Sequence, residues 1–177
     1  LLCSRRGHTG EEIDRAAKLI KLAGISLVLQ LMTGLPGDSE QKALSSARHA
    51  ADLQPDAVRI YPCLVLQRTE LAQRYLTGEY RPQTLEEAVK LCGQLLDIFR
   101  RRNIPVIKLG LHASSDFEGE ALLAGPYHPA FRELVEGAAF VEEVIKRLSS
   151  YGKRIEKLQI CVAPTFLSTA IGAHKKN

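Results

Sequence analysis

Apolar positions along the chain alternate between helical spacing and short continuous runs. Spacing of three and four residues predicts amphipathic helices, and runs of about four to eight apolar residues predict strands. The first predicted strand has the mostly apolar composition of a strand buried on both faces. The predicted helices cover residues 9–24, 38–51, 84–102 and 130–149, with short helical pieces at 70–76 and 167–171. The predicted strands cover residues 25–32, 57–61, 104–111 and 155–162.

Polar residues at the expected helix starts support these boundaries. Thr9 with Glu12, and Thr84 with Glu87, have the spacing of a capping box, in which each member satisfies a free backbone N–H of the first turn. Asp38 is the predicted N-cap of the second helix. A strand therefore alternates with a capped helix along most of the chain.

Alternating strands and helices are typical of βαβ units and a parallel sheet. Such a sheet can be an open doubly wound sheet or a barrel. The sequence has no GxGxxG after its first predicted strand, which excludes the dinucleotide-binding fingerprint. Three strand–helix units amount to about half of a complete barrel of roughly 250 residues.

The composition is that of a globular protein. Of 177 residues, 45% are hydrophobic and 25% are charged, which argues against disorder. The most apolar run, residues 25–32, is interrupted by Ser26 and Gln30 and falls well short of the roughly 18 residues of a membrane span. The opening residues are polar by Ser4. We therefore expect no secretory signal, no membrane partner and a cytoplasmic protein.

The four cysteines are far apart in the sequence. They are Cys3, Cys63, Cys92 and Cys161, and they form no CxxC or CxxxCxxC spacing. We therefore expect no local zinc or iron–sulfur motif within this chain, no metal ligands and no disulfides.

Basic residues gather toward the end of the chain. Residues 146–177 contain seven lysines and arginines and a single glutamate, a net charge of +6. The whole chain carries +4, so the preceding residues sum to −2. A basic end favours a polyanionic partner, and a solvated basic surface is the alternative interpretation.

Several segments, taken in order, carry a family resemblance. They are RRGHT at residues 5–9, QLMTGLPGD at 30–38, RIYP at 59–62, LQRTEL at 66–71, GEY at 78–80 and GPYHPAF at 125–131. The succession resembles the radical SAM superfamily, in the second half of the barrel of proteins akin to oxygen-independent coproporphyrinogen III oxidase. It is closer still to the elongator catalytic-subunit branch, whose members modify tRNA.

The resemblance implies an α/β fold. Residues 1–125 would form the C-terminal half of a (βα) partial TIM-type barrel, with parallel strands and crossover helices. Residues 126–177 would add a small C-terminal α/β extension. The missing N-terminal barrel half would be a partner of this chain, and without it we expect self-association through open sheet edges.

The resemblance also implies residues that bind S-adenosylmethionine (SAM). Arg6, whose motif His8 completes, would hold the methionine carboxylate, which a guanidinium can grip bidentately. Gln30 stands where the family usually has an aspartate on the SAM ribose. Gly34 and Pro36 belong to the turn that approaches the ligand.

The adenine is expected beside Tyr61. Each of these residues also has a plain structural interpretation, such as a solvent-facing arginine, a core amide or an ordinary strand-to-helix turn. His112 and His128 are candidate catalytic residues, with surface or packing positions and a loop-fixing hydrogen bond as the alternatives. The catalytic residues themselves stay unknown.

Radical SAM chemistry needs a [4Fe–4S] cluster bound by three closely spaced cysteines. In the superfamily these cysteines form CxxxCxxC after the first barrel strand, and this chain has no such motif. SAM and the cluster are therefore expected in a longer parent enzyme and not on this chain alone. As a fragment, the chain is expected to be inactive.

Residues 162–177 resemble the start of a KH module, in which a strand and a short helix lead into a GxxG loop that clamps nucleic-acid backbone. The corresponding GAHK begins at Gly172 and lacks the second glycine. The resemblance implies RNA contacts from Gly172, His174, Lys175 and Lys176, and RNA or tRNA as a partner.

The two resemblances together imply the C-terminal fragment of a radical SAM enzyme that acts on RNA, with a tRNA base as the expected target. One alternative is a non-catalytic RNA-binding or scaffolding module built on a half barrel. A second alternative is a fragment of a TIM-like metabolic enzyme that uses no SAM.

Overall fold

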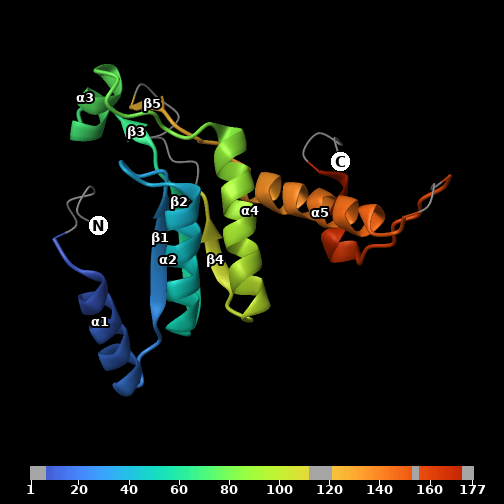
Figure 1. Ribbon diagram of the computed structural model, residues 1–177, viewed down its shortest axis with the longest axis horizontal. Helices are drawn as coiled ribbons and strands as arrows, with labels where there is room; N and C mark the ends of the chain where they lie inside the picture. Colours follow the sequence, from blue (N-terminus) through green and yellow to red (C-terminus); the bar gives the residue numbers. More distant parts are fainter. Residues whose placement is uncertain (1–6, 112–120, 153–155, 173–177) are drawn as a thin grey trace.

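A three-stranded parallel sheet forms the centre of the protein. The computed structural model describes residues 7–111, 121–152 and 156–172. Strands β1 (Val28–Thr33), β2 (Ala57–Pro62) and β4 (Val106–Leu109) lie in the order β1-β2-β4, and both pairs are parallel. Helices connect these strands (Figure 1). The predicted α/β class with parallel strands is confirmed.

The helices occupy the predicted segments. A short antiparallel pair, which the sequence did not indicate, joins the connection after β2 to the segment before α5. The helices are α1 (Gly10–Leu22), α2 (Glu40–Asp52), α3 (Glu70–Leu76), α4 (Leu85–Arg101), α5 (Phe131–Ser149) and α6 (Leu167–Ile171). A 3-10 turn, η2 (Pro164–Phe166), precedes α6, and the short pair consists of β3 (Val65–Leu66) and β5 (Leu122–Ala124).

The hydrophobic core lies between one face of the sheet and helices α2 and α4. Small side chains on α2 let this helix approach α4 closely, and larger side chains on α4 fill the space above β2. The buried members include Ala47, Ala51, Leu95, Phe99, Val58 and Ile60.

The opposite face of the sheet is exposed in the part of the chain that the structure describes. Gln30 and Arg59, at paired positions of β1 and β2, are both exposed, and Val28 is 43% exposed. The prediction of a first strand buried on both faces is therefore wrong. It assumed a second covering layer, and none of the described helices packs on this face.

Capping chemistry explains where the helices begin. Both predicted capping boxes are confirmed, with the Thr9 and Thr84 side chains accepting from the third helical N–H. The second helix differs from the prediction, because its N-cap is Ser39 and not Asp38. Asp38 instead accepts from the backbone N–H of Gly34 at 3.0 Å and fixes the turn after β1.

The C-terminal region is helical in its described part. Helix α5 runs without interruption through the buried Gly137 and extends away from the sheet, with α6 packed on it (Figure 1). The predicted strand at 155–162 is wrong, because the described residues 156–163 form no strand and belong to neither described sheet. The described part of the predicted α/β extension thus contains helices and irregular chain only.

At one edge of the parallel sheet, an arginine side chain occupies a backbone hydrogen-bonding position. The Val58 N–H bonds to Pro105 O, so the next carbonyl, that of Val106, points to the outer edge of β4. Arg132 of α5 donates its Nη1 to that carbonyl at 3.0 Å, and its Nε lies 3.1 Å from Glu136. Arg132 therefore takes the hydrogen-bonding position that a further strand would need.

Among the described helices, none is both long and apolar enough to cross a membrane.

Candidate functional site

The turn after β1 is fixed by a hydrogen bond within the turn and by two hydrogen bonds to the segment that precedes α4. Gly34 has a φ of +74°, which favours glycine, and its N–H donates to Asp38. The Tyr80 hydroxyl, from the segment before α4, donates to the Gly34 carbonyl at 2.5 Å. Thr33, buried at the end of β1, donates to Gln83 Oε1 at 3.1 Å. This turn is therefore a rigid element at the carboxyl end of the sheet.

The side chain of Gln83 lies directly over Gly34. A Cβ added at Gly34 would lie 2.7 Å from Gln83 Oε1, so a larger residue here would displace the end of the Gln83 side chain in addition to straining the backbone. Next to this contact, a groove of about 530 Å³ runs between the turn and the start of α4. Its charged lining residues are of both signs: Asp38, Glu40, Glu79, Glu87, Arg74, Arg81 and Lys90.

Cys63 and Tyr80 lie behind this turn, at the carboxyl end of β2. Burial raises the pKa of the Cys63 thiol, and the nearby Tyr80 hydroxyl opposes that effect. Burial, followed by the proximity of Cys63, also raises the pKa of Tyr80 above its ordinary value of 10.0. Both groups therefore stay protonated near neutral pH, so Tyr80 acts as a hydrogen-bond donor to the turn and not as a base.

Polar side chains line up on the exposed face of the sheet. Gln30 pairs with Arg59, and a register shift between Val58 and Arg59 places Lys108 of β4 opposite Arg59. Tyr61, two residues after Arg59, is on the same face, and Lys108 Nζ lies 5.9 Å from the centre of its ring. We call Gln30, Arg59, Tyr61 and Lys108 the open face. It combines an amide, two cations and an aromatic ring.

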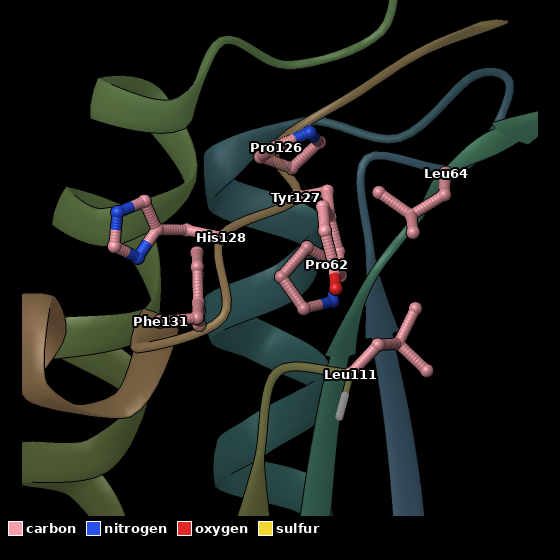
Figure 2. Close-up of a pocket in the computed structure, with 7 residues that line it drawn as sticks. All are labelled: Pro62, Leu64, Leu111, Pro126, Tyr127, His128 and Phe131. Atoms are coloured by element: carbon pink, nitrogen blue, oxygen red, sulfur yellow. The ribbon is translucent and has the colours of Figure 1, made fainter. Parts of the chain in front are cut away.

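A small cavity lies at the carboxyl ends of β2 and β4, between these ends and the segment that leads into α5 (Figure 2). Its volume of about 10 Å³ leaves room for about one water molecule. Figure 2 shows the imidazole of His128 directed away from Pro62 and Tyr127. His128 Nδ1 accepts from the Ala130 N–H at 3.1 Å, immediately before α5. In this arrangement His128 fixes the loop, which is the alternative stated for it above.

The structure brings together some of the predicted site residues. Gln30 and Tyr61 share the open face, and the turn containing Gly34 and Pro36 adjoins its carboxyl end. His8 is exposed just before α1. Gly172 ends α6 with a φ of 72°. Arg6, His112, His174, Lys175 and Lys176 lie outside the described residues.

The sequence did not single out Arg59 and Lys108 as site residues. A signal was present, because each is a long cation inside an otherwise apolar strand. Such a residue must either find a buried partner or face solvent. The register shift that sets Lys108 beside Arg59 leaves no trace in the hydrophobic pattern.

The described cysteines do not fit an iron–sulfur cluster. Cys63 and Cys92 are buried and Cys161 is exposed. No group of three His, Cys, Asp or Glu side chains in the described ranges could hold a metal ion. The thiolates that a cluster requires must therefore come from other residues.

The two buried thiols should resist alkylation in the folded protein. Burial raises the pKa of Cys92 to about 12; at about pH 8 roughly one thiol in ten thousand is then ionised, and only the thiolate reacts. We expect iodoacetamide to label Cys161 in the native chain and to label Cys63 and Cys92 only after unfolding in urea. Peptide mass spectrometry measures the labelling, and rapid labelling of Cys92 in the native protein would contradict this packing.

Comparisons with known proteins agree with this geometry. Residues 55–139 match the radical SAM C-terminal domain. A tRNA uridine(34) acetyltransferase of Methanocaldococcus jannaschii is 39% identical over 90 residues, which are 49% of this chain and 17% of that protein. Human elongator complex protein 3 is 23% identical over 134 residues, covering 74% of this chain and 24% of that protein.

A solved structure extends the likeness to most of the fold. The archaeal Elp3 of Methanocaldococcus infernus, with an N-terminal deletion, aligns with 86% of this chain at 29% identity and a TM-score of 0.60. The chain covers 33% of that structure and about a quarter or less of the two curated relatives named above. The family match, the relatives and the shared fold together show a likeness to the radical SAM superfamily, and within it to proteins of the elongator type.

Proposed function

We propose that this chain is the C-terminal half of the catalytic barrel of a radical SAM enzyme that modifies tRNA in the cytoplasm. In this proposal residues 1–125 complete a partial barrel and residues 126–177 form the extension that follows it. The observation that carries the proposal is the open face itself. A parallel sheet whose unburied face presents Gln30 and Tyr61, next to a rigid turn at its carboxyl end, has the form of one wall of a barrel site.

The chain's own residues would bind and orient SAM. The Gln30 amide can both donate to and accept from ribose hydroxyls, and the Tyr61 ring offers a flat apolar surface for adenine. Hydrogen bonds with Asp38 and Tyr80 fix the turn around Gly34, so less conformational entropy of the turn is lost when a ligand binds. Arg6 is proposed to hold the methionine carboxylate, and His8, two residues later, completes its motif.

The cluster would be supplied by a CxxxCxxC motif of a preceding barrel half. When both groups are bound, SAM and the [4Fe–4S] cluster supply a 5′-deoxyadenosyl radical. The 177-residue chain alone is proposed to be inactive, since its described cysteines do not fit a cluster. Two relatives support tRNA as the class of substrate, because the proteins from Methanocaldococcus jannaschii and Methanocaldococcus infernus are each named a tRNA uridine(34) acetyltransferase.

A replacement of Arg6 tests the proposal. In a protein that carries this chain together with a CxxxCxxC-bearing half, Arg6→Ala should reduce SAM affinity by about 100-fold, because a charge-assisted bidentate contact is lost. Equilibrium dialysis with labelled SAM measures binding, and release of 5′-deoxyadenosine measures cleavage. Arg5→Ala removes a neighbouring charge and should leave both unchanged.

The outcome also decides between enzyme and binding module. If the cluster-loaded protein neither binds SAM nor releases 5′-deoxyadenosine, the enzyme proposal fails. The alternative, a non-catalytic RNA-binding module on a half barrel, is favoured by the net charge of +6 on residues 146–177. SAM affinity that is the same in Arg6→Ala and wild type would reject the role of Arg6.

A further inference from the structure

Arg59 and Lys108 place two positive charges side by side on neighbouring strands. They are paired in register across β2 and β4, and parallel strands lie roughly 4.8 Å apart. Both side chains leave the sheet on the same face as Tyr61, because Arg59 precedes Tyr61 by two residues and Lys108 Nζ approaches its ring. The pair therefore forms one continuous positive site on the open face.

This pair differs from the described arginines of helices α3, α4 and α5. Every described arginine of α3, α4 and α5 has an acidic partner within 4 Å: Arg74, Arg100, Arg101, Arg132 and Arg147. Within the described residues, Arg59 and Lys108 form no ion pair. Like charges at paired strand positions destabilise a sheet. An anion shared by the two would remove that repulsion.

We propose that Arg59 and Lys108 together bind a phosphate group of the RNA substrate. A guanidinium contacts two phosphate oxygens with parallel N–H groups, and an ammonium adds a point charge to a third. Next to this pair lie Gln30 and Tyr61, the residues proposed above to orient SAM, so a phosphate held here would bring an RNA nucleotide beside the SAM site. The proposal rests on the proposed function, which makes the open face a wall of the RNA-modifying site.

The exposure of Arg59 argues against a purely structural role for the pair. A structural arginine in this fold packs against backbone or acid, as Arg132 does with Val106 and Glu136. Arg59 instead extends from an apolar strand onto an exposed surface. Its replacement should therefore change ligand binding much more than stability.

The test measures binding of a fluorescein-labelled oligouridine pentamer to the full 177-residue chain by anisotropy. At about 50 mM salt, Arg59→Gln and Lys108→Gln should each weaken binding by roughly 3- to 10-fold, as expected for loss of one phosphate contact. Each should also reduce the slope of log affinity against log salt by about 0.7 between about 50 and 200 mM. Arg59→Lys, which keeps the charge, should retain more affinity than Arg59→Gln.

Arg48→Gln and Lys18→Gln are the matched controls. Each removes one exposed cation, from α2 and α1 respectively, and neither residue is on the sheet. Circular dichroism confirms that each variant is folded. A peptide nucleic acid with the same bases and an uncharged backbone should bind weakly and equally to all variants, because its backbone offers no phosphate.

The outcomes separate the phosphate site from the proposed function. The phosphate site is overturned if the open-face variants bind RNA as well as the controls, if the uncharged analogue binds as tightly as RNA, or if wild type binds no RNA. In the first two cases the SAM experiment can still support the enzyme. Weakened RNA binding by the open-face variants alone, combined with no SAM cleavage, would support the phosphate site and reject the enzyme.

Discussion

Gly110→Ala should lower the free energy of unfolding by about 2 to 4 kcal/mol, which would be among the largest effects of any single methyl group added to this chain. Gly110 directly follows β4 and has a φ of +78°, where an L-residue is strained. A Cβ here would lie 2.7 Å from the Phe131 ring and 2.8 Å from Phe131 Cβ. Because the Cβ is fixed to the backbone, α5 itself would have to move.

Gly78→Ala separates strain from collision. Gly78 has the same φ of +78° but no atom within 4 Å of an added Cβ. Its replacement should lower the free energy of unfolding by only about 1 kcal/mol, which is the strain of placing an L-residue at this positive φ. Urea denaturation of both variants measures the difference. Equal losses of stability would show that the contact between Gly110 and Phe131 is not tight.

Phe99→Ala should lower the free energy of unfolding by about 3 to 5 kcal/mol. Phe99 is fully buried on α4, in the core that also contains Ile60, Leu95 and Val106. Removing its ring leaves a cavity that the surrounding helices and strands can fill only partly, so contacts and hydrophobic burial are both lost.

Phe166→Ala is the control of the same chemistry. Phe166 lies in η2 and is 57% exposed, so its truncation should cost less than about 1 kcal/mol. Thermal or urea unfolding of the two variants gives the comparison. A loss for Phe99→Ala as small as that for Phe166→Ala would mean that the core between α2, α4 and the sheet is loosely packed.

Local signals predicted most of the fold because local chemistry sets most of its boundaries. The capping threonines at 9 and 84 start their helices through contacts within one turn, which a sequence pattern can reveal. Ser39 was missed as a cap since Asp38 has the same capping chemistry and is used by Gly34 instead. The strand expected at 155–162 failed because strands need a partner edge, and an apolar alternation says nothing about whether one is near.

The candidate site was predictable only in part. Gln30 was found through the family resemblance, yet its exposure depends on the absence of a described second layer over the sheet. The pairing of Arg59 with Lys108, which are 49 residues apart in the sequence, depends on a register shift between β2 and β4. Long-range register is decided by packing of the whole sheet, so single-strand patterns cannot give it.

The hydrogen bond from Arg132 to the outer edge of β4 makes the two edges of the parallel sheet unequal as places for a further strand. With the Val106 carbonyl already bonded, an additional strand can join most readily along β1, which is the opposite edge. A preceding barrel half would add there in parallel. Two copies of this chain that met at the same edge around a twofold axis would place β1 against β1 running in opposite directions. The polarity of that junction therefore distinguishes completion of the barrel from association of copies.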